Sequence, residues 1–547
     1  MTIKNITIAL LTVSLLASCN KDIILAEPVY PPAQTLDFRF TTDKPVPATV
    51  NEGGTVTYKA VGLKAKEGKF KFFISGIEAE IISLTDNDIM VRVPQGAITS
   101  NPSILFEDKI IYGPLLKVNG DIVIDPNFSV SGSRANGPTF GMVTSPTGYY
   151  VYGSFSNFNN QATVEVPIRG VANVNASGNW HGTQYITNRV FDGGAVRDMH
   201  PVGSDFIVSG DFSSYFIDNI GTSSDKRYAD VFGIAGINNQ GAFKTQYVDI
   251  INEDLENENG GIDTVSAING GVENGSIVKS FITTDNKYVL VGNFRNYVSV
   301  FYPSSTKIAR YMDRVLSANN IRINADGSFD STYNYSFANK AGYGIASGNI
   351  LDAVKLNNDD IIIVGSFNQY QNVSTNYIAK IKNSDGRIDE TFNNGQAGAN
   401  GQIQSVTYNK ANGKLLLAGT FTKYNNVDVN GVVMINADGS IDPSFQFATI
   451  KGGTVNYAKQ IAYKNIVVVS GSFTTYDDKP RPGLIFLDNT GKMINGYNRF
   501  GLFRGDLNSI YEITDSNTGL PTLFLMGSFN MFDNTEVGNF LKINFVK

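Results

Sequence analysis

The sequence predicts an all-β protein in which a small N-terminal β-sandwich precedes a β-propeller. Three observations carry this prediction. The chain has 547 residues, more than the about 250 to 300 that one hydrophobic core supports. Its 54 Gly, 35 Phe and 26 Tyr, with only 17% charged residues, are typical of strands and turns. A short glycine-aromatic pattern also recurs seven times along the chain.

Residues 1–18 are predicted to be a lipoprotein signal peptide. Lys4 precedes an apolar stretch from Ile6 to Ala17, which is too short to span a bilayer. The sequence "LASC", ending at Cys19, resembles a bacterial lipobox, which implies cleavage before Cys19 and acylation of that residue. The alternative is a secreted protein with a cysteine near its cleavage site. Cys19 is the only cysteine, so no disulfide is expected.

Residues 19–35 are predicted to form a lipidated stalk, because Pro28, Pro31 and Pro32 favour extended backbone. Residues 36–114 then alternate apolar and polar positions between Gly, Asn and Asp turns, which predicts a β-sandwich. The segment "FKFFISGIEAEIISLTDNDIMVRVPQGA" resembles the immunoglobulin-like IPT/TIG module. This resemblance covers about 80 residues and implies an immunoglobulin-like fold.

Residues 115–547 are predicted to form the propeller. The pattern G-[STDN]-F-x-x-[YF] recurs at spacings of 57, 82, 73, 54, 52 and 56 residues, each copy after an apolar strand. Most copies lead into a second strand and an N-x-D-G turn, so each repeat has the strand content of a blade. Seven blades are favoured, with six and eight as alternatives. The copies begin at Gly153, Gly210, Gly292, Gly365, Gly419, Gly471 and Gly527.

The glycine and the two aromatic residues stand at fixed positions within each copy of the pattern, which suggests that they have the same structural role each time. The glycine is expected where two backbones approach closely or a strand bulges, and the two aromatic residues are expected to pack between blades. "LLKVNGDIVIDPNF", residues 115–128, resembles "VVMINADGSIDPSF", residues 432–445, whereas no such segment follows the last repeat at "FLKINFVK". The N-terminal segment is therefore expected to complete the blade begun by the C-terminal one.

No familiar catalytic or metal site is expected. The chain has two histidines, no G-x-S-x-G elbow and no phosphate-binding loop. A glycosidase would need two placed carboxylates, but the obvious acids recur in the repeat turns, as Asp326, Asp385 and Asp438, and again four residues later, as Asp330, Asp389 and Asp442. Recurrence favours a turn role for these residues over catalysis or calcium binding. No cofactor is expected.

The candidate ligand site lies in "ASGNWHGTQY", a segment between the first two copies of the pattern that we interpret as non-repetitive. Trp180, the only tryptophan, could stack on a sugar ring while neighbouring amides bind its hydroxyls. The predicted ligand-binding residues are Asn179, Trp180, His181, Gln184 and Tyr185. The alternative, which is favoured, is that Trp180 caps the propeller core or seals the contact to the sandwich.

Two insertions are candidate interaction segments. Residues 252–261 are acidic and predict a solvated loop, whereas residues 305–320 carry apolar residues at helical spacing and predict a helix. Such a helix could dock a partner or cover a blade edge.

The repeats resemble the "delta-60" propeller repeats of bacterial surface proteins. Together with the lipobox and the sandwich they resemble a Bacteroidetes lipoprotein family associated with SusC/SusD-like importers. The resemblance implies an accessory role beside such an importer and does not imply a ligand. Our leading hypothesis is a non-enzymatic lipoprotein of the outer membrane, with the cell surface favoured over the periplasmic side, that binds an oligomeric nutrient, glycan ahead of peptide. The alternative is a structural or docking subunit without substrate contact. The net charge of −6 without a basic run argues against nucleic acid as a partner.

Overall fold

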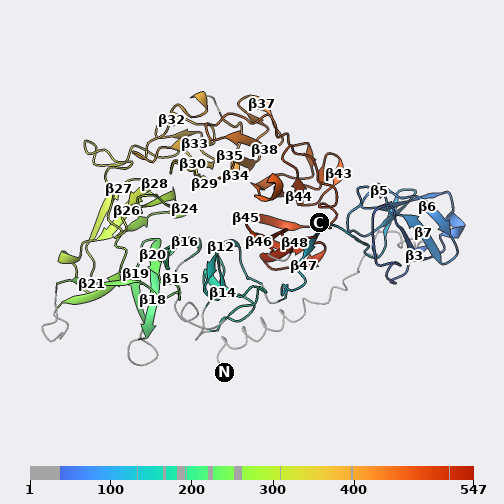
Figure 1. Ribbon diagram of the computed structural model, residues 1–547, viewed down its shortest axis with the longest axis horizontal. Helices are drawn as coiled ribbons and strands as arrows, with labels where there is room; N and C mark the ends of the chain where they lie inside the picture. Colours follow the sequence, from blue (N-terminus) through green and yellow to red (C-terminus); the bar gives the residue numbers. More distant parts are fainter. Residues whose placement is uncertain are drawn as a thin grey trace, which may run out of the picture.

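The computed structural model describes residues 37–131, 134–163, 168–181, 191–192, 194–219, 226–251, 261–307, 309–395, 398–515 and 518–546. The predicted signal peptide, Cys19 and the stalk lie outside these residues. In the described part of the chain, no helix is both long and apolar enough to cross a membrane. Figure 1 shows a ring of sheets with a smaller β unit beside it.

The smaller unit consists of two four-stranded sheets around one core. Alternating residues of both sheets point inward, so that Tyr58, Phe72 and Ile89 are fully buried in it. The first sheet has the order β1 (Arg39–Phe40), β3 (Thr55–Val61), β7 (Asp88–Arg92) and β6 (Ile81–Leu84). The second has the order β5 (Ile77–Glu78), β4 (Phe70–Ile74), β8 (Ser103–Phe106) and β9 (Lys109–Tyr112). Its classification as an immunoglobulin-like IPT/TIG module stays a prediction.

The ring is a β-propeller of antiparallel sheets, and the described residues contain seven sheets built on one plan. In six of them three consecutive main strands pair in the order inner, middle, outer. These are β12 (Thr139–Ser145), β13 (Gly148–Gly153), β14 (Val171–Val174); β16 (Val196–Val202), β17 (Asp205–Gly210), β20 (Ile234–Ile237); β24 (Ser276–Ile282), β25 (Tyr288–Asn293), β28 (Asn320–Ile323); β29 (Ile350–Lys355), β30 (Ile361–Gly365), β33 (Ile378–Ile381); β34 (Ile403–Asn409), β35 (Lys414–Gly419), β38 (Val432–Asn436); β40 (Val455–Gln460), β41 (Val467–Gly471), β44 (Leu484–Leu487). The seventh sheet holds β45 (Arg504–Thr514), β46 (Pro521–Phe532) and β48 (Phe540–Phe545).

Short strands and 3-10 turns connect or extend these sheets. Linking strands are β2 (Thr49–Val50), β10 (Lys117–Val118), β15 (Phe191–Asp192), β18 (Ser214–Asn219), β19 (Lys226–Asp230), β21 (Thr245–Asp249), β22 (Ile262–Ser266), β23 (Gly271–Glu273), β26 (Asn296–Val300), β27 (Met312–Leu316), β31 (Gln369–Tyr370), β32 (Val373–Ser374), β36 (Lys423–Tyr424), β37 (Val427–Asp428), β39 (Ile450–Lys451), β42 (Thr475–Tyr476), β43 (Lys479–Pro480) and β47 (Thr535–Glu536). The 3-10 turns are η1 (Lys64–Lys66), η2 (Tyr302–Ser304), η3 (Phe392–Gly395) and η4 (Tyr463–Asn465).

The recurrent glycine lies where two strands approach too closely for a side chain. In each sheet it ends or lies in the middle strand and pairs with an inner-strand residue next to a bulge, as Gly419 pairs with Ile403. A Cβ atom added at Gly419 would lie closer than 3.0 Å to the carbonyl oxygen of Gln402, and the other six copies meet the equivalent carbonyl in the same way. The predicted role of the glycine is confirmed.

The two aromatic residues of the pattern are buried between neighbouring sheets, as predicted. Phe473 and Tyr476, for example, share one hydrophobic cluster with Leu416 and Val432 of the preceding sheet. All fourteen aromatic side chains of the seven copies are less than 9% exposed: Phe155, Phe158, Phe212, Tyr215, Phe294, Tyr297, Phe367, Tyr370, Phe421, Tyr424, Phe473, Tyr476, Phe529 and Phe532. Each sheet thereby buries a face that it could not bury alone.

The ring is closed by the N-terminal segment, as the sequence predicts. Strand β11 (Ile122–Ile124) pairs antiparallel with β48, with Ile124 opposite Ile543. In other sheets the equivalent contact is made within one repeat, for instance between Ile435 and Ile441. Residues from the two ends of the propeller therefore form one sheet.

An ion pair reinforces this closure. Asp125 is 4% exposed and accepts the Lys542 ammonium of β48 at 2.6 Å and the Asn127 amide at 2.8 Å. Burial alone would raise the pKa of Asp125, but these hydrogen bonds outweigh burial and lower its pKa.

Replacing Asp125 with Asn should therefore lower the free energy of unfolding by about 2 kcal/mol at pH 7. A carboxylate with a lowered pKa stabilises the fold above its unfolded pKa of about 3.9, and this contribution is lost as the pH falls through the folded pKa. The difference between wild type and variant should accordingly shrink below about pH 4. Urea unfolding followed by the fluorescence of Trp180, the single tryptophan, measures this. A difference that stays constant down to pH 3 would contradict it.

The helix predicted over residues 305–320 is wrong. The described part of this segment holds strand β27, which pairs with β26 from Val300 opposite Met312 to Asn296 opposite Leu316. Arg314 also contacts Glu273 of β23 at 2.6 Å across the same sheet. Five backbone pairs with a neighbouring strand outweigh the local helical pattern of so short an apolar run. The acidic insertion, residues 252–261, lies almost entirely outside the described residues.

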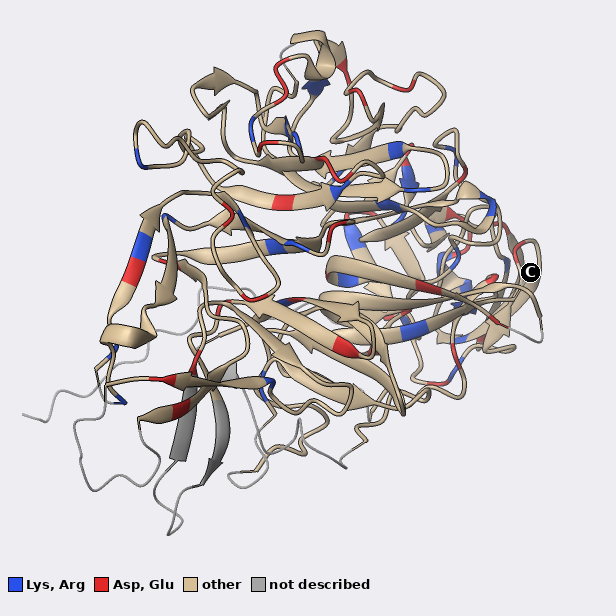
Figure 2. Cartoon of the chain, turned by 60° about the vertical axis from the view of Figure 1, so that its left-hand side comes forward, with Lys and Arg blue, Asp and Glu red and all other residues tan. Residues whose placement is uncertain are grey.

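Contacts between the smaller unit and the propeller lie at the rim of the ring. Arg499 donates to Glu52 at 2.7 Å, and the Thr99 amide donates to the Arg499 carbonyl at 3.0 Å. Figure 1 shows the smaller unit beside the ring and not over its centre. Basic and acidic residues are intermixed over the coloured strands and loops in Figure 2. The exclusion of nucleic acid as a partner stays a prediction.

Candidate functional site

The inner strands of the propeller present a variable set of side chains to its central channel. Each inner strand carries a bulge at the same place, one residue after the position that pairs with the recurrent glycine. A bulge re-aims the side chains that follow it. The residues directly after the bulges are Gly141, Asp198, Lys279, Asp352, Ser405, Tyr457 and Ser509.

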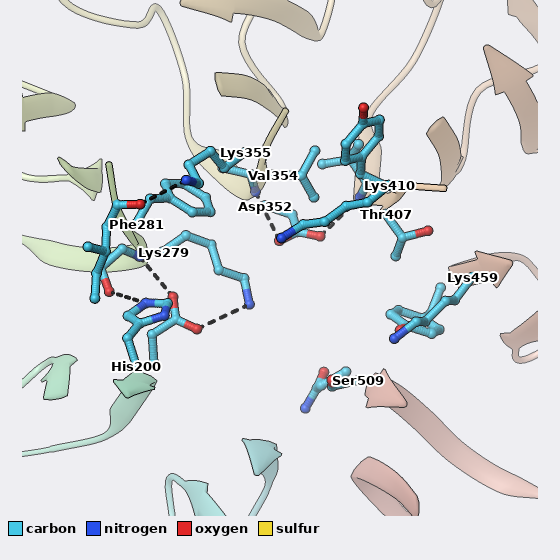
Figure 3. A pocket seen from close by; sticks show the side chains of 18 of the residues that line it. His200, Lys279, Phe281, Asp352, Val354, Lys355, Thr407, Lys410, Lys459 and Ser509 are labelled. Atoms are coloured by element: carbon cyan, nitrogen blue, oxygen red, sulfur yellow. Dashed lines mark hydrogen bonds and ion pairs between the residues drawn. The ribbon is translucent and has the colours of Figure 1, made fainter. Parts of the chain in front are cut away.

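A cavity of about 490 Å³ opens in this channel. Its lining comes from six of the seven sheets and combines charged, hydroxyl and aromatic side chains, as Figure 3 shows. A second cavity of about 230 Å³ shares Lys279, Asp352, Tyr457 and Asn508 with it. The size and the few convergent polar groups are those of a small-ligand site.

One wall of the cavity is a network around Asp198. The Lys279 ammonium lies 3.8 Å from Asp198, whose other oxygen accepts the Ser280 amide of the next sheet at 2.8 Å. His200 contacts the Ser280 hydroxyl at 3.0 Å. The charge of Asp198 raises the pKa of Lys279 against the opposing effect of burial. Burial lowers the pKa of His200, so the imidazole is neutral at pH 7.

A second wall is built around Asp352 and Lys355. The Asp352 carboxylate accepts the Ala353 amide and the Val406 amide of the next sheet, both at 2.9 Å. Burial raises the pKa of Asp352. The Lys355 ammonium donates to the Ile282 carbonyl at 2.8 Å and to the carboxylate of Asp359. Both side chains are thus held in place by the surrounding protein.

Lys459 stands on the far side of the cavity in Figure 3. Its ammonium donates to the Ile510 carbonyl at 2.5 Å, and no carboxylate lies within 4.0 Å of it in the described part of the chain. Burial lowers the pKa of Lys459. The protonated lysine is therefore held in an environment that disfavours its charge.

This placement predicts a pH-dependent stability difference between wild type and Lys459→Met. Because the folded pKa of Lys459 lies below its unfolded value of about 10.4, the unfolded state binds more protons between the two values, and wild-type stability rises with pH there. Wild type should gain stability relative to the variant between pH 7 and pH 10, measured by urea unfolding. The exposed Lys451 of the short strand β39, replaced with Met, should show no such trend. Parallel curves for wild type and K459M would contradict the prediction.

The predicted ligand residues around Trp180 lie away from this cavity. The Trp180 indole packs against the core shared by the first, sixth and seventh sheets, and its Nε1 is buried without a hydrogen-bond partner in the described residues. His181 is exposed, its amide bound to the Asn173 carbonyl, and Asn179 donates its amide to Asn175 at 3.1 Å. Gln184 and Tyr185 lie outside the described residues. These contacts agree with the core-sealing alternative, and ligand binding here stays a prediction.

The premise that this segment is non-repetitive is wrong. Trp180 forms a bridge with Val174, which is the bridge that Ile441 forms with Ile435 in another sheet. The Asn175 amide likewise bonds the Asn179 carbonyl, as the Asn436 amide bonds the Ser440 carbonyl. "NASGNW" is therefore a divergent copy of the repeat turn "NADGSI".

The recurrent aspartates have the turn role that the sequence predicts. Asp438 accepts the Ser440 amide at 2.9 Å and its hydroxyl at 2.7 Å. Asp442 does the same for Ser444 and also accepts Lys414 at 2.9 Å. These bonds hold two residues of each turn in place. Among the described residues no three His, Cys, Asp or Glu side chains converge on a metal site. The absence of a metal, a cofactor and an enzymatic activity stays a prediction.

Comparison with known proteins matches two segments of the propeller to a family model, and that family has no described function. Residues 357–392 and 410–445 match a family described as a domain of unknown function (DUF5122) β-propeller. A search of curated proteins finds no significant match. A structural genomics protein of unknown function from Bacteroides thetaiotaomicron is 10% identical with a TM-score of 0.25, over 94% of this chain and 99% of that one. An auxiliary nutrient binding protein from Bacteroides ovatus is 10% identical with a TM-score of 0.28, over 92% and 97%. Resemblance at this level does not distinguish one function from another.

Proposed function

We propose that the protein is a non-catalytic nutrient-binding lipoprotein of the outer membrane with a propeller of seven blades. Acylation of Cys19 would anchor it, and its place at the cell surface would serve a SusC/SusD-like importer. The ligand is an oligomeric nutrient, a glycan in preference to a peptide. The resemblance of the leader and repeats to importer-associated lipoproteins supports the anchoring and the partner.

The single observation that carries ligand binding is the channel cavity. It has about 490 Å³ of space, and its lining includes the partly buried aromatic side chains of Phe281 and Tyr408 and the hydroxyl groups of Thr407 and Ser509. An aromatic ring can stack on the apolar face of a sugar while hydroxyl and charged groups bind its oxygens. The fixed side chains of Asp352 and Lys355 supply a wall that needs little rearrangement on binding.

The experiment is a binding screen with the chain from Asn20 onward, against soluble glycan and peptide libraries. Saturable binding of one ligand class, lost in a Phe281→Ala and Tyr408→Ala double variant, is expected. Phe337→Ala provides the control, because Phe337 is 72% exposed and does not line the cavity. Absence of binding to either library would overturn nutrient binding.

A second candidate function is docking to the importer without substrate contact. Its support is an exposed aromatic pair at the end of the hairpin of β26 and β27, where Phe301 and Tyr311 are 48% and 60% exposed and their ring centroids lie 6.2 Å apart. Purification from the native outer membrane in mild detergent, with mass spectrometry of co-eluting proteins, distinguishes the two. Recovery of an importer pair that is lost with Phe301→Ser and Tyr311→Ser supports docking, whereas recovery of the lipoprotein alone overturns stable association.

A further inference from the structure

The channel cavity contains more cations than its own acids neutralise. Four lysines but only two aspartates line it: Lys279, Lys355, Lys410, Lys459, Asp198 and Asp352. Lys355 is paired with Asp359 behind the wall, and Lys279 faces Asp198 at 3.8 Å. The Asp352 carboxylate is occupied by two backbone amides.

Lys410 and Lys459 are the cations left without an acidic partner. Neither ammonium has a carboxylate within 4.0 Å in the part of the chain that the structure describes, and the only hydrogen bond of Lys459 there is to the Ile510 carbonyl. Lys410 is exposed at the mouth of the cavity, whereas Lys459 is half-buried inside it. In Figure 3 the side chains of Lys279, Lys410 and Lys459 border the same open space.

The unpaired ammonium of the half-buried Lys459 is costly to keep charged, and an anion placed between it and Lys410 reduces that cost. Coulomb attraction is stronger in the channel than in bulk water, because protein replaces much of the high-dielectric solvent. The lining also includes the Ser509 hydroxyl and the Asn508 side-chain amide, which donates one of its two hydrogens to the Thr139 carbonyl at 3.0 Å and keeps the other. Such groups bond the remaining oxygens of a bound anionic group.

We propose that this cavity binds an acidic saccharide, with its carboxylate or sulfate group between Lys279, Lys410 and Lys459. This inference rests on the proposed nutrient-binding function and names the chemical class of the ligand. The ring that carries the acid group is placed next to Phe281 and Tyr408. Neutral oligosaccharides of the same length lack the group that satisfies the lysines and are discriminated against.

The test compares four probes by isothermal titration with the chain from Asn20 onward. Oligogalacturonate carries carboxylates, sulfated galactan oligosaccharides carry sulfates, β-1,4-galactan oligosaccharides are neutral, and a poly-glutamate peptide is acidic without a sugar. We expect saturable binding of at least one acidic saccharide, at least tenfold tighter than the neutral one. The affinity should also fall as the salt concentration rises from 50 to 500 mM, because salt screens the lysines.

The variant K410M/K459M removes both unpaired charges with little loss of side-chain length, and it should weaken acidic-saccharide binding at least tenfold. The control K451M/K492M removes two exposed lysines that do not line the cavity, one in β39 and one in the turn after β44, and should bind as wild type does. If the double variant does not fold, K410M alone serves, since Lys410 is exposed at the cavity mouth. A threefold or larger loss is expected for it.

The outcomes separate this inference from the proposed function. Tight binding of the neutral oligosaccharide, equal in wild type and K410M/K459M, overturns the acidic ligand and leaves nutrient binding standing. Binding of the peptide alone overturns the saccharide class. Failure of all four probes, when the library screen detects a ligand, also overturns the acidic saccharide. Failure of both experiments overturns nutrient binding itself.

Discussion

Replacing Phe540 with alanine should destabilise the propeller by about 4 kcal/mol, because it removes a large buried side chain at the closure. Phe540 is fully buried in β48, directly beside the strand that the N-terminal segment adds. Its ring lies 5.5 Å from that of Phe128, in an edge-to-face arrangement, and stacks on Phe524 at 5.7 Å. The substitution therefore weakens contacts between the two ends of the propeller as well as the core.

Urea unfolding followed by Trp180 fluorescence measures this loss, since Trp180 packs against the same core. Phe337→Ala is the matched control, because Phe337 is 72% exposed and its removal should change the free energy of unfolding by less than about 0.5 kcal/mol. If the two variants lowered the free energy of unfolding equally, the contacts of Phe540 at the closure would not contribute to stability as predicted.

Replacing Gly419 with alanine should lower the free energy of unfolding by about 3 kcal/mol. The new methyl group would lie closer than 3.0 Å to the Gln402 carbonyl oxygen and also to the Ile403 Cα. These are backbone atoms of a paired strand, so they can move aside only by disrupting the bulge that shapes the channel lining.

Gly236→Ala provides the control for this prediction. Gly236 is also buried in a propeller strand, but a Cβ there would meet only the flexible side chain of Lys244, at 3.4 Å or more. We expect the control to change stability by less than about 1 kcal/mol. If both substitutions lowered the free energy of unfolding equally, the loss of glycine itself would explain the two results. The clash with the Gln402 carbonyl would then not be the cause at Gly419.

Most of the propeller could be predicted from the sequence because its stability depends on local repetition. The recurring glycine and aromatic residues mark the same backbone approach and the same inter-sheet contact each time, so they stand out at a regular spacing. The likeness of residues 115–128 to residues 432–445 was sufficient to predict ring closure. Such signals report positions that every repeat must satisfy in the same way.

Features that depend on neighbouring strands could not be predicted in this way. Apolar residues of Met312–Leu316 fit a helix locally, and only pairing with β26 makes them a strand. Trp180 looked unique because its turn has lost the aspartate of the repeat. The channel residues were missed because an inner-strand position that varies from repeat to repeat resembles ordinary surface variation. An alignment of the seven inner strands on the residue after the bulge brings Asp198, Lys279 and Asp352 into one column.

The pairing of β11 with β48 also constrains when the protein can reach its native state. Ile122 pairs with Phe545. One of the first propeller strands to be synthesised therefore cannot pair until one of the last has been made. Contacts of such large sequence separation form slowly, and an unpaired strand edge is open to wrong partners meanwhile. The ring therefore remains open until β48 has been synthesised and has paired with β11. A chain that stops short of β48 would retain an exposed strand edge that proteases and chaperones can recognise, so closure distinguishes finished molecules from incomplete ones.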